Sequence, residues 1–194
     1  VGQGALMNIY EHLFHEYGQT VGQLLFTKGD AVNSKRYLYM RGTIQALLEL
    51  GAIPIVNEND AVSADEIKIG DNDTLSAIVA SVAEADLLII LSDIQGLYTK
   101  DPKSHPDAEL IHEVPAFSRE LFVIAGGAGT ARGTGGMYTK IQAAEICVHS
   151  GIDMNIEESD EKEVLLRTLD GEENGTTLRG ENVHPQLKKQ TTNT

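Results

Sequence analysis

Two polar clusters in the first half of the chain carry residue types that bind cations, ammonium groups or carboxylates. Asn57–Asp60 reads Asn-Glu-Asn-Asp and follows the apolar run Ala52–Val56, while Asp71–Asp73 precedes an apolar helical pattern. A calcium-binding loop would continue with a ligand and a glycine where Leu75 and Ser76 stand. The spacing therefore argues against a calcium loop. A helix cap, a solvated acidic loop and a substrate pocket remain as interpretations.

These interpretations apply to different parts of the segment. Asn72 or Asp73 is expected to cap the helix that follows, because both residue types accept hydrogen bonds from free N–H groups at a helix start. Capping does not exclude a role in ligand binding. The charged residues in the middle of the segment are interpreted as a solvated loop: Asp65, Glu66 and Lys68.

A glycine-rich segment, residues 125–144, offers a different chemistry. It matches neither the P-loop pattern nor the G-x-G-x-x-G fingerprint. Gly133–Gly136 instead opens a helical pattern with Thr139 and Lys140 in its first turn. Backbone N–H groups, a helix N-terminus and a lysine together favour an anion, so the segment is interpreted as a phosphate cradle. A flexible surface loop that caps an ordinary helix is the alternative.

Alternating helices and strands position these clusters. Periodicity predicts helices over residues 4–17, 35–50, 73–85 and 139–150, and strands over 21–26, 52–56, 86–91 and 152–156. The strand at 86–91 is expected to be buried on both faces. This alternation favours an α/β fold with a mostly parallel sheet between helices. Asn57–Asp60 and the pair Ser92–Asp93 directly follow two strands, where α/β sheets bind ligands.

The composition narrows the function classes. The 194 residues include 15 basic and 29 acidic side chains, a net charge of −14, which argues against nucleic acid as the principal partner. Many acidic residues between Glu157 and Glu173 are interpreted as a solvated surface. The longest apolar run, Leu87–Leu91, is far shorter than a membrane span.

Cysteine and histidine usage points away from redox and metal chemistry. The single cysteine, Cys147, is interpreted as a core residue on a helix in a reducing compartment, taken here as the cytoplasm. His12 and His15 could share a helix face, but no ligand spacing accompanies them, so no metal role is expected.

The segments considered together resemble the amino-acid kinase family, and within it the members that phosphorylate the side-chain carboxylate of glutamate. The resemblance rests on NEND at 57–60, GDNDTLSA at 70–77, ADLLIILSDIQGLYTKDP at 85–102 and GTGGMYTK at 133–140, and extends over residues 1–180. It implies a three-layer α/β/α sandwich. We expect that domain over residues 1–178 and a loose polar tail over 179–194.

The resemblance also implies roles for individual residues. Asp60 and Asn72 would bind the substrate, Asp73 would organise the environment of the catalytic lysine, and Lys140 would stabilise the transferring phosphoryl group. The implied nucleotide contacts are Ser92, Asp93, Thr134, Gly135, Gly136, Met137, Tyr138, Thr139 and Lys140.

The reaction implied by the resemblance is ATP-dependent phosphorylation of L-glutamate, the first step of proline synthesis. Mg²⁺ would be carried with the nucleotide. A homo-oligomer is expected, and the reductase that uses glutamyl phosphate would be the functional partner. Neither a nucleic acid nor a membrane is expected as a partner.

Two departures from the family pattern qualify this expectation. Family members begin with a strand that carries a lysine beside a Gly-Ser turn, and the chain given starts after it, so we expect this chain alone to be weakly active or inactive. Residues 155–163 are far more acidic than the family pattern, which would weaken ATP binding if they lie near the nucleotide. The alternatives are another small-acid kinase, acting on acetylglutamate or carbamate, and a non-catalytic ligand-binding module.

Overall fold

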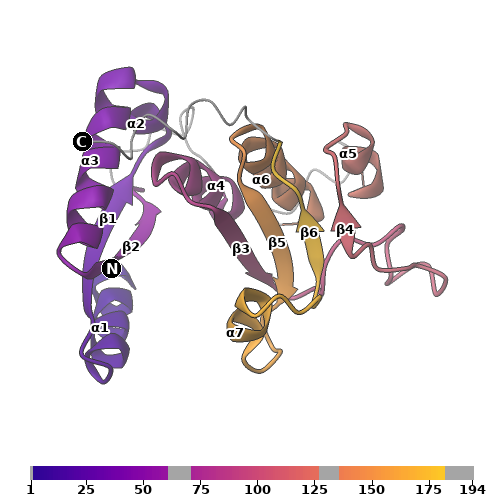
Figure 1. Ribbon diagram of the computed structural model, residues 1–194, viewed down its shortest axis with the longest axis horizontal. Helices are drawn as coiled ribbons and strands as arrows, with labels where there is room; N and C mark the ends of the chain where they lie inside the picture. Colours follow the sequence, from indigo (N-terminus) through magenta and orange to yellow (C-terminus); the bar gives the residue numbers. More distant parts are fainter. Residues whose placement is uncertain (1, 61–70, 127–135, 182–194) are drawn as a thin grey trace. The chain divides into compact units, whose positions relative to one another are not determined.

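The structure is a computed structural model that describes residues 2–60, 71–126 and 136–181, and it divides the chain into two compact units. Unit 1 is Val1–Leu75 and unit 2 is Ser76–Thr194. Figure 1 labels the helices and strands of both.

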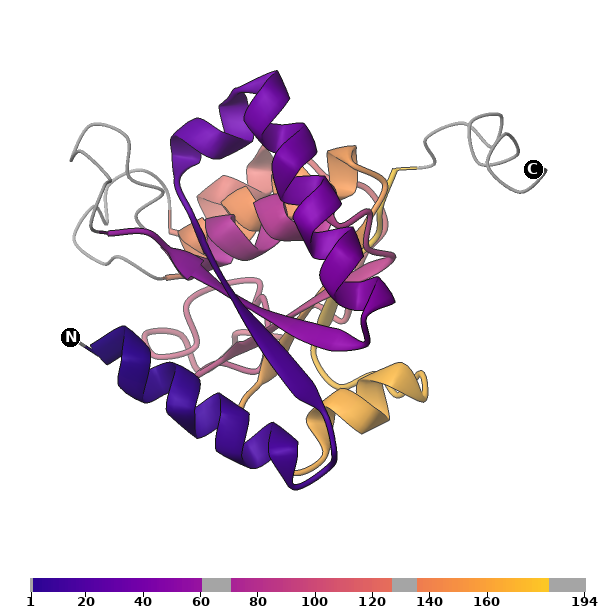
Figure 2. The same cartoon turned by 90° about the vertical axis from the view of Figure 1, so that its left-hand side faces the viewer.

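Unit 1 contains a parallel pair of strands and three helices that precede or connect them. Its elements in chain order are α1 (Gly2–His15), β1 (Thr20–Phe26), α2 (Lys28–Val32), α3 (Ser34–Glu49) and β2 (Ala52–Glu58). The strands pair from Thr20 opposite Ala52 to Phe26 opposite Glu58. Figure 2 shows them running between α1 and α3. The helices and strands predicted in this region are confirmed, and α2 is an additional helix that the sequence analysis did not predict.

Local sequence signals explain the ends of α3. The side chain of Asn33 accepts hydrogen bonds from the backbone N–H groups of Lys35 and Arg36, at 3.1 and 3.0 Å. These bonds satisfy two of the donors that a helix start leaves free. At the other end Gly51 has a φ of +71°, a conformation that glycine adopts without a steric penalty.

Helix α4 (Asn72–Val82) contains the boundary between the units, and its cap corrects one prediction. The carboxylate of Asp71 accepts from the backbone N–H of Thr74 at 2.6 Å and from its hydroxyl at 3.0 Å. The capping residue is therefore Asp71. The prediction that Asn72 or Asp73 caps the helix is wrong, because both are already inside the first turn.

Unit 2 is built on a four-stranded sheet in the order β3-β5-β6-β4. Its further elements in chain order are β3 (Leu87–Ser92), β4 (Glu113–Val114), α5 (Glu120–Ile124), α6 (Met137–His149), β5 (Asp153–Glu158), α7 (Val164–Leu169) and β6 (Thr176–Leu178). Strands β3 and β5 are parallel, as are β4 and β6, whereas β5 and β6 are antiparallel. The prediction of a mostly parallel sheet with helices is confirmed.

Helix α6 lies beside strand β5 (Figure 1), and both contribute fully buried residues to the hydrophobic core of unit 2. Ile141 and Cys147 of α6 and Met154 and Ile156 of β5 are each 0% exposed. The prediction that Cys147 is a core residue on a helix is confirmed. Burial raises the pKa of its thiol to about 12. The prediction that β3 is buried on both faces is wrong, because Leu91 is 44% exposed.

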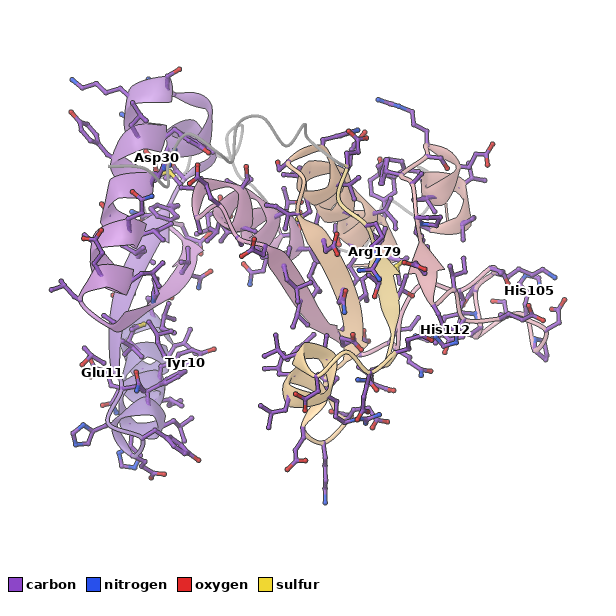
Figure 3. The ribbon with its side chains drawn as sticks, viewed as in Figure 1. Tyr10, Glu11, Asp30, His105, His112 and Arg179 are labelled. Atoms are coloured by element: carbon purple, nitrogen blue, oxygen red, sulfur yellow. The ribbon has the colours of Figure 1, made fainter. Side chains whose placement is uncertain are left out.

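Arg179, the first residue of the predicted tail, is tied to the sheet. Its guanidinium forms ion pairs with Glu113 at 2.7 Å and Asp153 at 2.9 Å. Figure 3 labels Arg179 beside the sheet. Most of the predicted tail, residues 182–194, lies outside the described residues, so the boundary after residue 178 stays a prediction.

Candidate active site

The carboxyl end of β3 presents the first predicted nucleotide contacts. Ser92 is the last residue of the strand and is 9% exposed, whereas Asp93 follows it at the surface. The hydroxyl of Ser92 donates to the carboxylate of Asp93 at 3.3 Å. On the neighbouring strand Glu158 is the register partner of Ser92, and the N–H of Ser159 donates to the Ser92 carbonyl at 2.7 Å. The acidic segment 155–163 therefore does lie beside this edge.

A pocket of about 220 Å³ lies next to this edge, and its lining is largely apolar. It joins the residues that follow Asp93, the first residues of the arm between β3 and β4, the end of α5 and the start of α6. The lining residues are Ile94, Leu97, Tyr98, Lys100, Asp101, Pro102, Ile124, Ala125, Gly126 and Met137. The structure thus brings the segment after Ser92–Asp93 and the start of α6 to one place.

The sequence analysis predicted Met137 as a nucleotide contact but missed the other pocket residues. The pattern that follows Asp93 gave no periodic signal for a cavity wall. Lys100 is the cationic member of the lining, and its Nζ forms an ion pair with Asp107 at 2.5 Å. The available signal was the segment Ile94–Lys100, in which apolar residues and a lysine follow directly after a Ser-Asp strand end.

The start of α6 carries the remaining predicted nucleotide contacts that the structure describes. Gly136 is the N-cap, and the Thr139 hydroxyl accepts from its N–H at 3.2 Å and donates to its carbonyl at 2.7 Å. Lys140 follows and is 8% exposed, so its ammonium is carried on a largely buried side chain. Met137, Tyr138 and Thr139 are half-buried. Two further predicted contacts, Thr134 and Gly135, lie outside the described residues.

The predicted substrate residues belong to unit 1. Asp60 is exposed and follows β2 by two residues, Asn72 is the exposed first residue of α4, and Asp73 is half-buried in the first turn of that helix. The pocket and Lys140 belong to unit 2. Asp65, Glu66 and Lys68, predicted to form a solvated loop, lie outside the described residues.

Glu157 corrects the prediction that the acidic residues from Glu157 to Glu173 solvate a surface. It lies in β5 and is 1% exposed. Its Oε1 accepts from the amide of Asn155 and the hydroxyl of Thr168, each at 3.3 Å, while its Oε2 has no hydrogen-bond partner among the described residues. Desolvation by burial raises the pKa of the Glu157 carboxyl.

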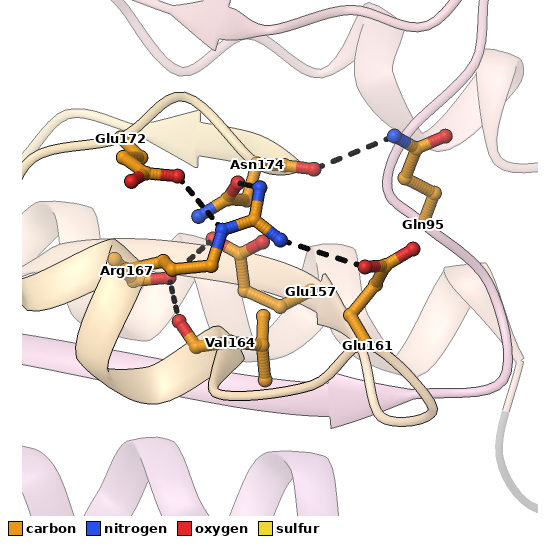
Figure 4. Close-up of polar contacts among 8 residues, drawn as sticks. Gln95, Glu157, Glu161, Val164, Arg167, Glu172 and Asn174 are labelled. Atoms are coloured by element: carbon orange, nitrogen blue, oxygen red, sulfur yellow. Dashed lines mark hydrogen bonds and ion pairs between the residues drawn. The ribbon is translucent and has the colours of Figure 1, made fainter.

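Figure 4 shows Arg167 and its polar contacts near Glu157. Its guanidinium contacts Glu172 at 2.7 Å, Asn174 at 2.5 Å and Glu161 at 3.5 Å. The pattern of acidic residues in the sequence could not separate the buried Glu157 from exposed neighbours such as Glu161 and Glu172.

A larger hollow of about 400 Å³ lies on unit 1, and none of the predicted site residues lines it. Its lining residues are Asn8, Glu11, His12, His15, Gln19, Thr20 and Val21. Figure 3 labels Glu11 on α1, and His105 and His112 between β3 and β4. No group of three metal-ligating side chains occurs within residues 2–60, 71–126 and 136–181.

Within the described part of the chain, no helix combines the length and the apolar character needed to cross a membrane.

Comparison with known sequences decides the family. The sequence model of the amino acid kinase family matches residues 1–157. The chain belongs to this family. The glutamate 5-kinase of Caldanaerobacter subterraneus subsp. tengcongensis is 58% identical over 178 residues, which are 92% of this chain and 48% of that relative. The glutamate 5-kinase of Clostridium tetani is 52% identical over 176 residues, 91% of this chain and 66% of the relative.

The chain thus spans about half to two thirds of the length of these amino acid kinases. Among solved structures, UMP kinase from Ureaplasma parvum aligns with a TM-score of 0.58 at 15% identity, over 90% of this chain and 65% of that one. An isopentenyl phosphate kinase aligns with a TM-score of 0.51 at 22% identity, over 70% and 49%. These likenesses concern the fold, and with the family match they confirm the predicted α/β fold class.

Proposed function

We propose that this chain is part of an enzyme that transfers the γ-phosphoryl group of ATP to the side-chain carboxylate of L-glutamate, as the first step of proline synthesis. The observation that carries the proposal is the 58% identity over 178 residues to a glutamate 5-kinase. The geometry of unit 2 supplies the physical support.

The pocket of unit 2 is proposed to hold the nucleotide. Its apolar walls, including Leu97 and Met137, suit a planar base that leaves water. The start of α6 and Lys140 suit the phosphates, because a helix N-terminus and a lysine both favour negative charge. Ser92 and Asp93 are proposed to contact the nucleotide from the end of β3.

Mg²⁺ is proposed to arrive with ATP. Such ions keep water ligands and bind through phosphate oxygens and one or two carboxylates. Asp93 is a carboxylate at the exposed end of β3, so the residues present fit an ion of this kind. When bound, the ion would neutralise part of the phosphate charge.

Unit 1 is proposed to supply the amino-acid subsite. The Asp60 carboxylate can pair with the substrate ammonium group, and the Asn72 amide can donate to its α-carboxylate. Asp73 is proposed to organise the environment of the catalytic lysine, Lys140. A carboxylate that pairs with the ammonium group would favour an amino acid over a simple dicarboxylate.

The chemistry needs no general base. A side-chain carboxyl with a pKa of about 4.3 is ionised at neutral pH, so its oxygen is already the nucleophile. That oxygen forms a bond to the γ-phosphorus, the bond from phosphorus to the β,γ-bridging oxygen breaks, and ADP leaves with the electron pair. The barrier is the approach of two anions, which Lys140 and the N–H groups at the start of α6 would lower.

The proposal is tested with the full-length protein, Mg-ATP and hydroxylamine, which converts an acyl phosphate into a coloured hydroxamate. L-Glutamate should give hydroxamate and an equal amount of ADP. N-Acetylglutamate, carbamate and L-aspartate are the comparison substrates and should give a much lower rate. If the enzyme converts one of these faster than glutamate, the proposed substrate is wrong. If the protein binds the ligands but forms no ADP, the non-catalytic alternative is favoured.

We further propose a cytoplasmic homo-oligomer whose acyl phosphate product passes to a reductase. Light scattering of the full-length protein tests the oligomer. A monomer at assay concentration with full activity would contradict it.

A further inference from the structure

Thr176 makes two hydrogen bonds that join segments far apart in the sequence. The residue lies in β6 and is 0% exposed. Its hydroxyl accepts from the backbone N–H of Leu97 at 2.8 Å and donates to the carbonyl of Ile111 at 2.6 Å. The N–H of Ile111 in turn donates to the Leu97 carbonyl at 2.8 Å. One side chain therefore fixes both ends of the arm between Leu97 and Ile111.

The backbone around Thr176 leaves no room for adjustment. A Cβ on Gly96 would collide with the Thr176 hydroxyl and would lie 3.0 Å from the Thr176 nitrogen. A Cβ on Gly175 would collide with the carbonyl of Ile156 and would lie 2.7 Å from the carbonyl of Gln95. The segment 95–97 thus rests directly on the start of β6, with backbone against backbone.

The same segment forms part of the candidate nucleotide pocket. Ile94 and Leu97 line the pocket and are separated from the Ser92–Asp93 strand end by at most three residues. Thr176 itself is not among the lining residues. Its hydrogen bond to the backbone of Leu97 therefore supports a residue of the pocket wall without contact between Thr176 and the cavity.

We propose that Thr176 is a positioning residue for the nucleotide, because its hydroxyl holds the segment Asp93–Leu97 in the place that forms the pocket. The inference rests on the proposed function of that pocket. Without the hydroxyl, the Leu97 N–H and the Ile111 carbonyl would each lose a buried partner, and the cheapest response is a shift of the segment toward water. Nucleotide affinity would fall, whereas the proposed glutamate residues belong to unit 1 and take no part in these hydrogen bonds.

The test uses the full-length protein and three variants. Thr176→Val keeps the shape and removes the hydroxyl, Thr176→Ser keeps the hydroxyl, and Thr177→Val changes the neighbouring threonine, which points to the other face of the strand. The dissociation constant of Mg-ADP, the KM values for ATP and glutamate, and the exchange rate of the Leu97 amide are measured for each.

Thr176→Val should weaken Mg-ADP binding and raise the KM for ATP about tenfold, as expected for a lost buried hydrogen bond. The KM for glutamate should change less than about twofold, and Leu97 exchange should accelerate. Thr176→Ser and Thr177→Val should stay within about threefold of the unchanged protein in nucleotide binding.

Three results would overturn the inference. They are unchanged nucleotide binding by Thr176→Val, equal losses for both substrates, and failure of the serine variant to restore binding. If Thr176→Val does not fold, the serine variant and the exchange of Leu97 decide. If the unchanged protein binds no nucleotide, the proposed function fails; Leu97 exchange then tests the hydroxyl clamp by itself, and an unchanged rate in Thr176→Val would refute it.

Discussion

Lys140 and Glu157 are both ionisable side chains within the core of unit 2, at 8% and 1% exposure. Burying an ionised group costs free energy unless partners compensate for the lost water. Lys140 lies in the first turn of α6, where its charge would meet a phosphate bound at the helix start. Glu157 lies on β5 among Asn155, Thr168 and Arg167, which do not satisfy its Oε2. The position of Lys140 suits phosphate binding, whereas the burial of the Glu157 carboxyl lowers the stability of the protein at neutral pH.

The role of Lys140 gives a prediction for activity. Lys140→Met keeps an apolar side chain in the core but removes the charge, and kcat of the full-length protein should fall about 10²- to 10³-fold. Lys103→Ala is the matched control, because Lys103 is an exposed lysine on the arm between β3 and β4 that does not line the pocket, and it should keep its activity. Steady-state kinetics with ATP and glutamate measure both, and near-normal turnover by the methionine variant would refute the assigned role.

The raised pKa of the Glu157 carboxyl gives a prediction for pH dependence. Between its ordinary pKa and the higher value in the folded protein, only the folded state holds the proton. The free energy of unfolding should therefore fall as pH rises through this window. Glu157→Gln cannot titrate, so it should flatten this slope and be more stable than the unchanged protein at neutral pH.

Urea unfolding at a series of pH values measures the effect. Thr168→Val is the paired variant: it removes a hydrogen bond that lowers the pKa of Glu157, so the loss of stability should extend to higher pH. Equal slopes for the glutamine variant and the unchanged protein would show that Glu157 is charged in the folded state as readily as in the unfolded chain.

At the scale of elements, two glycines differ in the space that a methyl group would find beside them. Gly175 precedes β6 and faces backbone carbonyls from two directions, whereas Gly42 in α3 has no neighbouring atom within 4 Å of an added Cβ. Gly175→Ala should therefore lower the free energy of unfolding by about 2 kcal/mol or more.

The matched substitution Gly42→Ala should raise the free energy of unfolding by about 0.5–1 kcal/mol, since alanine restricts the unfolded chain and favours the helix. Denaturant titrations of the two variants give the comparison. Similar effects from both would mean that the contact of Gly175 with Ile156 and Gln95 is not tight in solution.

The periodic elements were predictable from the sequence, and the short ones were not. Helices α1, α3, α4 and α6 each carry enough turns for an apolar face to recur. Strands β4 and β6 have two and three residues, too few for an alternating pattern, and tertiary pairing specifies them. The polar environment of Glu157 was hidden for the same reason, because Thr168 and Gly175 approach it only through the fold.

The sequence allowed the positions of candidate residues to be predicted where they follow a strand or open a helix. Ser92, Asp93, Gly136 and Lys140 lie at such ends. Their roles as nucleotide contacts, which the family resemblance implies, stay predictions. The apolar walls around Leu97 and Ile124 could not be anticipated, because the pocket forms where separate segments meet.

For the whole molecule, the proposed ligands divide between the two units. The proposed nucleotide contacts within the described residues belong to unit 2, and the proposed substrate residues Asp60, Asn72 and Asp73 belong to unit 1. Amide exchange of the full-length protein should thus show protection by Mg-ADP within Ser76–Gly126 and Gly136–Glu181, and protection by glutamate within Val1–Leu75.

Each ligand is added separately at about 100 times its dissociation constant, enough to stabilise by about 2.7 kcal/mol. Protection of the same unit by both ligands would contradict the division of the site residues. Protection by neither would count against the proposed function itself.

The single buried thiol of Cys147 can serve as a built-in reporter of how often the core of unit 2 opens. No other cysteine exists in the chain, and this one is 0% exposed with a pKa of about 12. An alkylating reagent can therefore mark a molecule only after the core around Cys147 has opened. The rate of labelling would record how often that core opens, with no added probe and no signal from unit 1.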